Sequence, residues 1–272
     1  MHLRTVATTR YVTPLREGGS LPAIVEADDD GLYVLKFRGA GQGPKALVAE
    51  LVAGEIARVL GLPVPEIVLM TLDADLARTE PDPEIQALIR ASAGLNLALD
   101  YLPGAVMFDP VAERPGPTLA SQVLWFDALV TNLDRTCRNT NMLMWHGRLQ
   151  LIDHGAALYF HHDDADWYAR AADPFARVRD HVLLPFATAL READEALAPI
   201  LGVEPLVGIL AQVPDSWLVP IAAETEVAAP DGGDLAARAE ARRRQYLGYL
   251  THRLKPPRPF LEEALRARTL PV

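Results

Sequence analysis

The chain has 272 residues, half of them hydrophobic, with one cysteine and a formal net charge of −10. This composition excludes an intramolecular disulfide and argues against broad electrostatic binding to nucleic acid or to an anionic membrane. Because no apolar run reaches the roughly 18 residues that span a bilayer, and the first residues lack a signal-peptide core, we expect a cytoplasmic protein.

The first hundred residues are predicted to form a small antiparallel sheet and one long helix. Two β-rich runs, residues 21–27 and 32–37, are joined by an Asp-Asp-Asp-Gly turn and therefore predict a hairpin. A largely buried helix follows, with Gly43 as its N-cap, Pro44 at its first position and Gly61 at its end. The remaining expected elements are a strand at 66–72, a helix at 83–92 and a strand at 95–102.

A segment rich in proline and glycine, residues 103–117, is the predicted boundary between an N-lobe, residues 1–102, and a C-lobe, residues 103–272. Strand-rich and helical halves of this kind make an α+β fold. A cleft between two lobes is a favoured place for a small ligand. The C-lobe is expected to contain a helix at 118–132 capped by Thr118, two short strands around Gly147, an acidic loop at 161–173 and helices from about 180 onward.

The stretch TNLDRTCRNTNMLMWHGRLQLIDHG, residues 131–155, carries the main chemical signal. Asp134 precedes Asn139 by five positions, a predicted hairpin follows, and Asp153 stands in Asp-His-Gly. A protein-kinase catalytic loop places its base Asp and metal-binding Asn in this order, before a second metal-binding Asp. Mg²⁺ takes such oxygen ligands, so the spacing predicts ATP-dependent phosphoryl transfer. On spacing alone, helix capping by Asp134 and Asn139 and an ordinary turn at Asp153 stay open.

Lys36 supplies independent support from the N-lobe. It lies in the predicted strand YVLKF, on a run that should be mostly buried, where a charge is costly unless it is paired. A kinase pairs such a strand lysine with a helix glutamate. The next helix offers Glu50 and Glu55, which lie about 140° apart around its axis and cannot both face Lys36. We assign Glu50, because small residues share its side of the helix; an edge-strand lysine that reaches solvent is the alternative.

Two further segments are candidate nucleotide contacts. Gly18, Gly19 and Ser20 lie where a loop over the nucleotide belongs, and their backbone amides could bind phosphate oxygens. A plain hairpin turn is the alternative for this segment. Asp100 and Leu102, just before a Pro-Gly break, form the predicted hinge, whose backbone groups would read the adenine edge.

Four segments of the chain together resemble the HipA-like kinases, within the protein-kinase-like superfamily that includes phosphatidylinositol kinases. They are VLKFRG, AELVAGEIARVLGLPVPE, NLDRTCRNTNML and LIDHGAAL. The resemblance implies that Asp134 is catalytic, that Asn139 and Asp153 bind the metal, and that Lys36 binds the nucleotide phosphates. It also implies a two-lobed protein-kinase-like fold with a β-rich N-lobe, one main N-lobe helix and a helical C-lobe.

The expected function is that of an ATP- and Mg²⁺-dependent kinase that transfers the γ-phosphoryl group to an acceptor hydroxyl. A protein is the favoured acceptor, as for a HipA-like Ser/Thr kinase, and no membrane or nucleic-acid partner is expected. A small-molecule or lipid phosphotransferase would use the same residues and stays open. So does a nucleotide-binding module without catalysis. The acidic run HHDDAD, residues 161–166, is interpreted as a solvated loop rather than a metal site.

Overall fold

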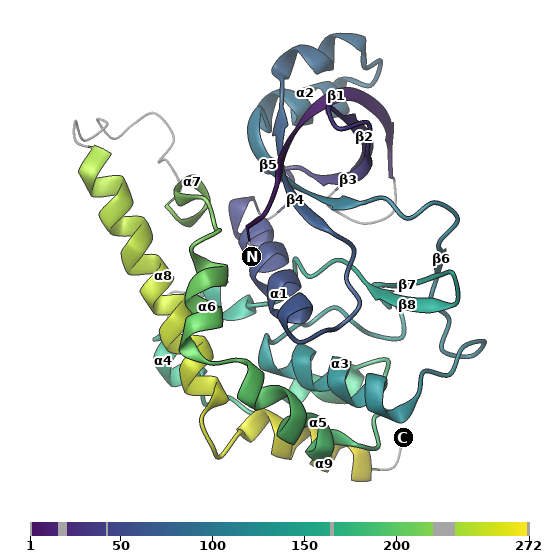
Figure 1. The fold of residues 1–272 in the computed structure, drawn as a ribbon, viewed down its shortest axis with the longest axis vertical. Helices are drawn as coiled ribbons and strands as arrows, with labels where there is room; N and C mark the ends of the chain where they lie inside the picture. Colours follow the sequence, from purple (N-terminus) through teal and green to yellow (C-terminus); the bar gives the residue numbers. More distant parts are fainter. Residues whose placement is uncertain (1, 16–20, 42, 164–165, 220–231, 271–272) are drawn as a thin grey trace.

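The computed structural model describes residues 2–15, 21–41, 43–163, 166–219 and 232–270 (Figure 1). The described chain begins with a closed β-barrel in the strand order β1-β2-β3-β5-β4. Neighbouring strands are antiparallel except β1 and β4, which are parallel. The strands are β1 (Thr5–Pro14), β2 (Ala23–Ala27), β3 (Leu32–Lys36), β4 (Ile67–Leu72) and β5 (Gly94–Asp100).

Strand β1 and the closure of the barrel are not among the sequence predictions. The other four strands lie within two residues of their expected bounds. In β1 only Val6 and Thr8 are buried, so its mostly exposed polar residues give no regular alternation. The purely antiparallel sheet expected from the sequence was therefore wrong at one pair, because β1 closes the barrel in parallel against β4.

The rest of the described chain is mostly helical and carries one small sheet, in the order β6-β7-β8. Its strands are β6 (Val106–Met107), β7 (Met142–Trp145) and β8 (Arg148–Leu151). The α-helices are α1 (Pro44–Val59), α2 (Pro83–Ala91), α3 (Pro117–Leu129), α4 (Trp167–Arg170), α5 (Leu190–Leu197), α6 (Val203–Leu210), α7 (Asp215–Leu218), α8 (Gly232–Leu254) and α9 (Pro259–Thr269). Short 3₁₀ turns are η1 (Ala74–Thr79), η2 (Tyr159–His162), η3 (Ala176–Asp180) and η4 (Ala198–Ile200).

Three local expectations in this region need correction. Helix α3 starts with Pro117 after the N-cap residue Gly116, so Thr118 lies inside the first turn and is not the cap. Proline suits that first position because its φ is preset and its missing N–H has no helical partner there. The acidic segment 161–173 is not all loop, because it contains the end of η2 and all of α4. The α-helices after the acidic segment begin at Leu190 rather than near residue 180.

Helix α1 lies between the barrel and the later helices, with contacts to β4, β5, α6 and α7 (Figure 1). All its residues from Leu47 to Ala57 are buried, which confirms the expected burial. A Cβ added at Gly54 would come within 2.4 Å of Ile67 Cδ1. The glycine therefore lets α1 approach β4 closely.

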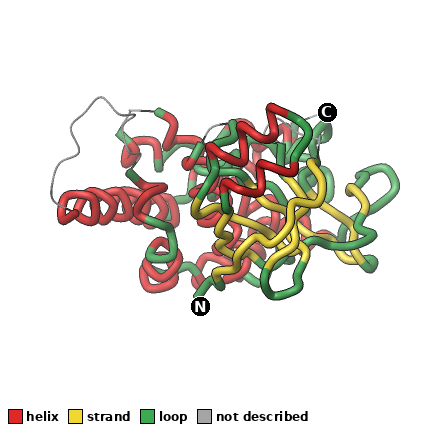
Figure 2. Tube along the Cα trace, turned by 90° about the horizontal axis from the view of Figure 1, so that it is seen from above, coloured by secondary structure: helices red, strands yellow, loops and turns green. Residues whose placement is uncertain are grey.

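The apolar interior consists of two clusters. One fills the barrel, and the larger one includes α1, α3 and the C-terminal helices. Figure 2 shows the strands gathered on one side of the molecule and most helices on the other. The α+β class predicted from the sequence is confirmed, whereas the division after residue 102 stays a prediction. No helix in the described ranges is long and apolar enough to cross a membrane.

Candidate active site

Lys36 lies at the centre of a charged cluster drawn from three parts of the chain. Its Nζ is 2.7 Å from Asp153 Oδ1, in the segment after β8, and 3.4 Å from Glu50 Oε2 on α1. The side chains of Lys36 and Glu50 are only 12% and 2% exposed, whereas that of Asp153 is 43% exposed. The cluster therefore combines two buried side chains, Lys36 and Glu50, with one partly exposed carboxylate, that of Asp153.

The charges in this cluster maintain one another. Burial alone would lower the pKa of the Lys36 ammonium, but the negative charges of Glu50 and Asp153 outweigh it and raise that pKa above its usual range. Burial would likewise raise the pKa of Glu50. The charge of Lys36 and the adjacent His154, whose backbone N–H donates to Glu50, reverse this and bring the pKa of Glu50 to about 2. Lys36 and Glu50 are both ionised at neutral pH.

Of the two glutamates weighed from the sequence, the structure places Glu50 beside Lys36. Glu50 also accepts a hydrogen bond on Oε1 from the backbone N–H of His154, at 3.0 Å. Glu55 points elsewhere and pairs with Arg58 at 2.6 Å. The helical periodicity that separates the two glutamates accounts for this difference. Glu50 thus joins the lysine strand to the segment that carries Asp153.

The loop between α3 and β7 brings Asp134 and Asn139 into direct contact. Asn139 Nδ2 donates to Asp134 Oδ2 at 2.7 Å. Asn141, which the sequence reasoning missed, lies 3.4 Å from the same oxygen through its Nδ2. It is 5% exposed and has a left-handed backbone with φ of 47°, which asparagine tolerates better than most residues. An asparagine just before a strand was the available signal.

A buried network beneath the loop was also missed. Asp127, on α3, accepts hydrogen bonds from Asn132 Nδ2 at 2.8 Å, Arg135 Nε at 2.6 Å and His181 Nε2 at 2.9 Å. The amide of Leu183 donates to His181 Nδ1, so Nδ1 is the acceptor and Nε2 carries the proton. Burial would raise the pKa of Asp127, but the Arg135 charge and the His181 hydrogen bond bring it well below its usual range.

This network holds Arg135, the residue that follows Asp134, in place. The side chains of Asp127 and Arg135 are both fully buried. Arg135 also donates through Nη1 to the carbonyl of Asn141, at the far end of the loop. Both ends of the loop are thereby attached to α3, and the loop conformation that presents Asp134 has rigid support.

The predicted hinge residues lie at the end of β5, where the backbone continues toward β6. The amides of Asp100 and Tyr101 donate to the carbonyls of Glu66 and Leu32. The Leu102 amide has no partner among the described residues, although its carbonyl accepts from Ala105. Burial, followed by the negative charge of Glu66, raises the pKa of Asp100. The charges that act on the Asp100 carboxyl are therefore those of Glu66, Arg4 and Asp29, and that of Lys36 is not among them.

Gly18, Gly19 and Ser20 lie outside the described residues.

The candidate metal ligands can be compared with the needs of Mg²⁺ through their donor chemistry. Asn139 uses its amide nitrogen on Asp134, which leaves its oxygen as the ligand atom. Asp153 is the exposed carboxylate of the cluster. Two such oxygen donors suit Mg²⁺, which keeps several waters and binds substrate phosphates. In the described ranges no group of three or more His, Cys, Asp or Glu residues could hold a metal alone.

Comparison with known proteins found a matching family model and solved structures of low sequence identity. The family model described as HipA-like kinase matches residues 9–232. Among solved structures, a Helicobacter pylori proinflammatory kinase, CtkA, is 13% identical, with 92% of this chain and 97% of that chain covered and a TM-score of 0.47. A Golgi casein kinase is 12% identical, covering 99% and 73%, with a TM-score of 0.45. The same Golgi kinase with Mn/ADP bound is 13% identical over 95% and 73%, again at 0.45. No curated protein sequence matches.

Proposed function

The chain belongs to the HipA-like kinase family, and we propose that it is an ATP- and Mg²⁺-dependent kinase that phosphorylates a hydroxyl group, preferably of a protein serine or threonine. The observation that carries this proposal is the Lys36 cluster. One ammonium, 12% exposed, lies within 3.4 Å of Glu50 and 2.7 Å of Asp153. A purely structural ion pair does not need a solvent-accessible carboxylate. A site for phosphate and metal does, because the carboxylate must reach the bound ion.

In this proposal each side chain has a separate task. Lys36, kept charged by its two carboxylate neighbours, binds nucleotide phosphate oxygens. Asp153 and the Asn139 oxygen hold Mg²⁺, which when bound neutralises the charge that develops on the phosphates. Asp134 orients the acceptor hydroxyl and takes up its proton. Asn139 fixes the Asp134 carboxylate through the 2.7 Å hydrogen bond, so that carboxylate needs little rearrangement during the reaction.

The proposed nucleotide contacts outside the cluster use backbone atoms. The N–H of Leu102, which has no partner in the described part of the chain, is proposed to contact the adenine ring, whereas the amide of Asp100 already donates to Glu66. We assign the adenine contact to Leu102 and leave Asp100 the role of ending β5. Gly18, Gly19 and Ser20 are proposed to cover the phosphates with their amides, as a loop preceding β2 would.

The test is transfer of label from γ-labelled ATP with Mg²⁺ and a cell extract. Asp134→Ala and Asp153→Ala are each expected to reduce transfer by roughly a hundredfold or more, since each removes positioning or metal charge. Asp75→Ala, which removes an exposed carboxylate on η1, is the matched control and should retain the wild-type rate. Label in a protein band supports the proposed acceptor. Label in a small molecule or a lipid would show that the acceptor is not a protein. Folded variants of Asp134 and Asp153 with wild-type rates would refute the site.

A further inference from the structure

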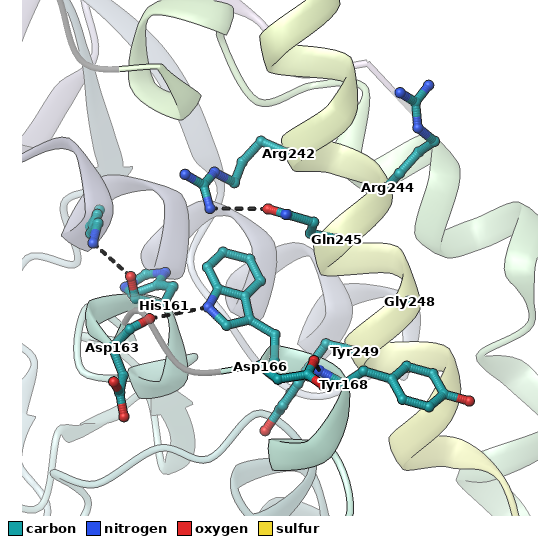
Figure 3. Close-up of a pocket in the computed structure, with 11 residues that line it drawn as sticks. His161, Asp163, Asp166, Tyr168, Arg242, Arg244, Gln245, Gly248 and Tyr249 are labelled. Carbon is teal, nitrogen blue, oxygen red and sulfur yellow. Dashed lines mark hydrogen bonds between the residues drawn. The ribbon is translucent and has the colours of Figure 1, made fainter.

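A pocket that is lined by none of the Lys36-cluster residues lies between the start of α1, the end of η2, α4 and α8 (Figure 3). Its volume is about 410 Å³, within the range typical of small-molecule sites. The wall residues used below are Lys45, Asp163, Asp166, Trp167, Arg242 and Arg244. None of these residues has a role in the proposed phosphoryl transfer.

Two cations in this pocket lack a carboxylate partner in the described part of the chain. Lys45 Nζ donates to the carbonyl of His161 at 2.6 Å. Arg242 donates to Gln245 Oε1 at 3.0 Å, and its guanidinium lies 5.0 Å from the centre of the Trp167 ring. These neutral partners orient both cations without neutralising them.

The acidic residues of the wall are engaged elsewhere. Asp163 forms a salt bridge with Arg170, and Asp166 caps α4 by accepting from the Tyr168 amide at 2.9 Å. The third cation of the wall, Arg244, lies 3.8 Å from Glu240. Figure 3 shows Arg244 extending away from the pocket, whereas Arg242 and Gln245 face it.

The surroundings of His161 are consistent with a positive field in the pocket. Its ring contacts Tyr246 at 2.8 Å and His162 at 3.1 Å. Burial, and then the charges of His162, Lys45 and Arg242, lower the pKa of His161 to about 3. The imidazole is therefore neutral at pH 7 and adds no third charge, so among the described wall residues the cations without a carboxylate partner are Lys45 and Arg242.

We propose that this pocket binds a small phosphate monoester whose dianion lies between Lys45 and Arg242. A phosphate monoester carries about −1.5 to −2 charges at pH 7 and offers three acceptor oxygens, which matches two cations that have no carboxylate partner among the described residues. A carboxylate or sulfate monoanion would leave one cation unbalanced. The remaining volume accommodates the organic group of the monoester.

Calorimetric titration of the full chain at low salt tests this assignment, with phenyl phosphate as the probe. We expect saturable binding of one molecule per chain and clearly weaker binding of phenyl sulfate, which has the same shape but one charge. Inorganic phosphate should also bind more weakly, because it leaves the organic part of the pocket empty. Equal affinity for all three probes, or no saturable binding of phenyl phosphate, would overturn the proposal.

Three variants locate the binding. Lys45→Gln and Arg242→Gln should each weaken phenyl phosphate binding about tenfold or more, as expected for the loss of a charge-assisted hydrogen bond. Arg191→Gln removes the same charge from an exposed position on α5 that does not line the pocket, and should leave the affinity within about twofold. If all three variants weaken binding equally, the probe senses only the overall positive charge of the protein and not this pocket, and the proposal is wrong. If Lys45→Gln and Arg242→Gln both bind normally, the ligand lies elsewhere. Circular dichroism checks that each variant is folded.

Discussion

Replacing Asp127 by asparagine tests whether a buried ion pair holds the loop that carries Asp134. Asp127 and Arg135 are both fully buried, 2.6 Å apart, and Asn132 and His181 donate to the same carboxylate. In the variant an NH₂ group replaces one acceptor oxygen and faces these donors, while Arg135 keeps a buried charge without a counter-ion. Removing one partner of a buried pair costs about 3–5 kcal/mol. Against a typical total of about 5–15 kcal/mol, this is a large loss.

Urea unfolding at pH 7 measures this loss, and two comparisons make it specific. Asp180→Asn breaks the exposed pair with Arg177 and should cost less than about 1 kcal/mol. The double variant Asp127→Leu with Arg135→Met removes both buried charges, and should cost less than the sum of the two single changes. A loss below about 1 kcal/mol for Asp127→Asn, or strict additivity in the double variant, would refute the reasoning.

Two further predictions concern acid. The pKa of Glu50 is about 2 in the folded protein and about 4.5 when unperturbed, so its contribution to stability is complete above pH 4.5 and is lost as the pH falls toward 2. In urea unfolding, Glu50→Gln should therefore reduce the difference between the stabilities measured at pH 6 and at pH 3, and an unchanged difference would contradict the ion pair. The pKa of His161 is about 3 against an ordinary 6.5, so the unfolded chain takes up its proton first and stability falls from pH 6.5 downward. His161→Asn should make the stability change less between pH 7.5 and pH 5 than in the unmutated protein. An unchanged dependence of stability on pH would mean that His161 is protonated in the folded state.

The parts of the site that could be predicted depend on short-range geometry. Asp134 and Asn139 are five positions apart in one loop, and they meet through a 2.7 Å hydrogen bond. Glu50 follows from helical periodicity, since only one of two glutamates about 140° apart can face a given lysine. These inferences needed no knowledge of how distant segments pack. The contact between Lys36 and Asp153, 117 positions apart, required the order of motifs along the chain as well.

The parts that could not be predicted involve residues whose type suggests the opposite environment. Arginine is usually found at the surface, but Arg135 is only 1% exposed, because Asp127 supplies its counter-charge. His181 reaches the same carboxylate from 54 positions away, with no local pattern to indicate it. Strand β1 is missed for a similar reason, because hydrogen bonds to β2 and β4 hold a segment that buries little apolar surface.

Helix α1 connects the two proposed ligand sites. Near its start, Lys45 donates to the carbonyl of His161, and both residues line the pocket of Lys45 and Arg242. Five residues later, Glu50 binds the His154 amide and lies beside Lys36. The same helix is therefore attached at two points to the segment that follows Asp153. A shift of α1 would change the Lys36–Glu50 pair and the Lys45 contact together, because Glu50 and Lys45 are both on this helix. Because both contacts are made by this one buried helix, we predict that a ligand at one site changes the affinity of the other site, and linkage requires the factor to be the same in both directions.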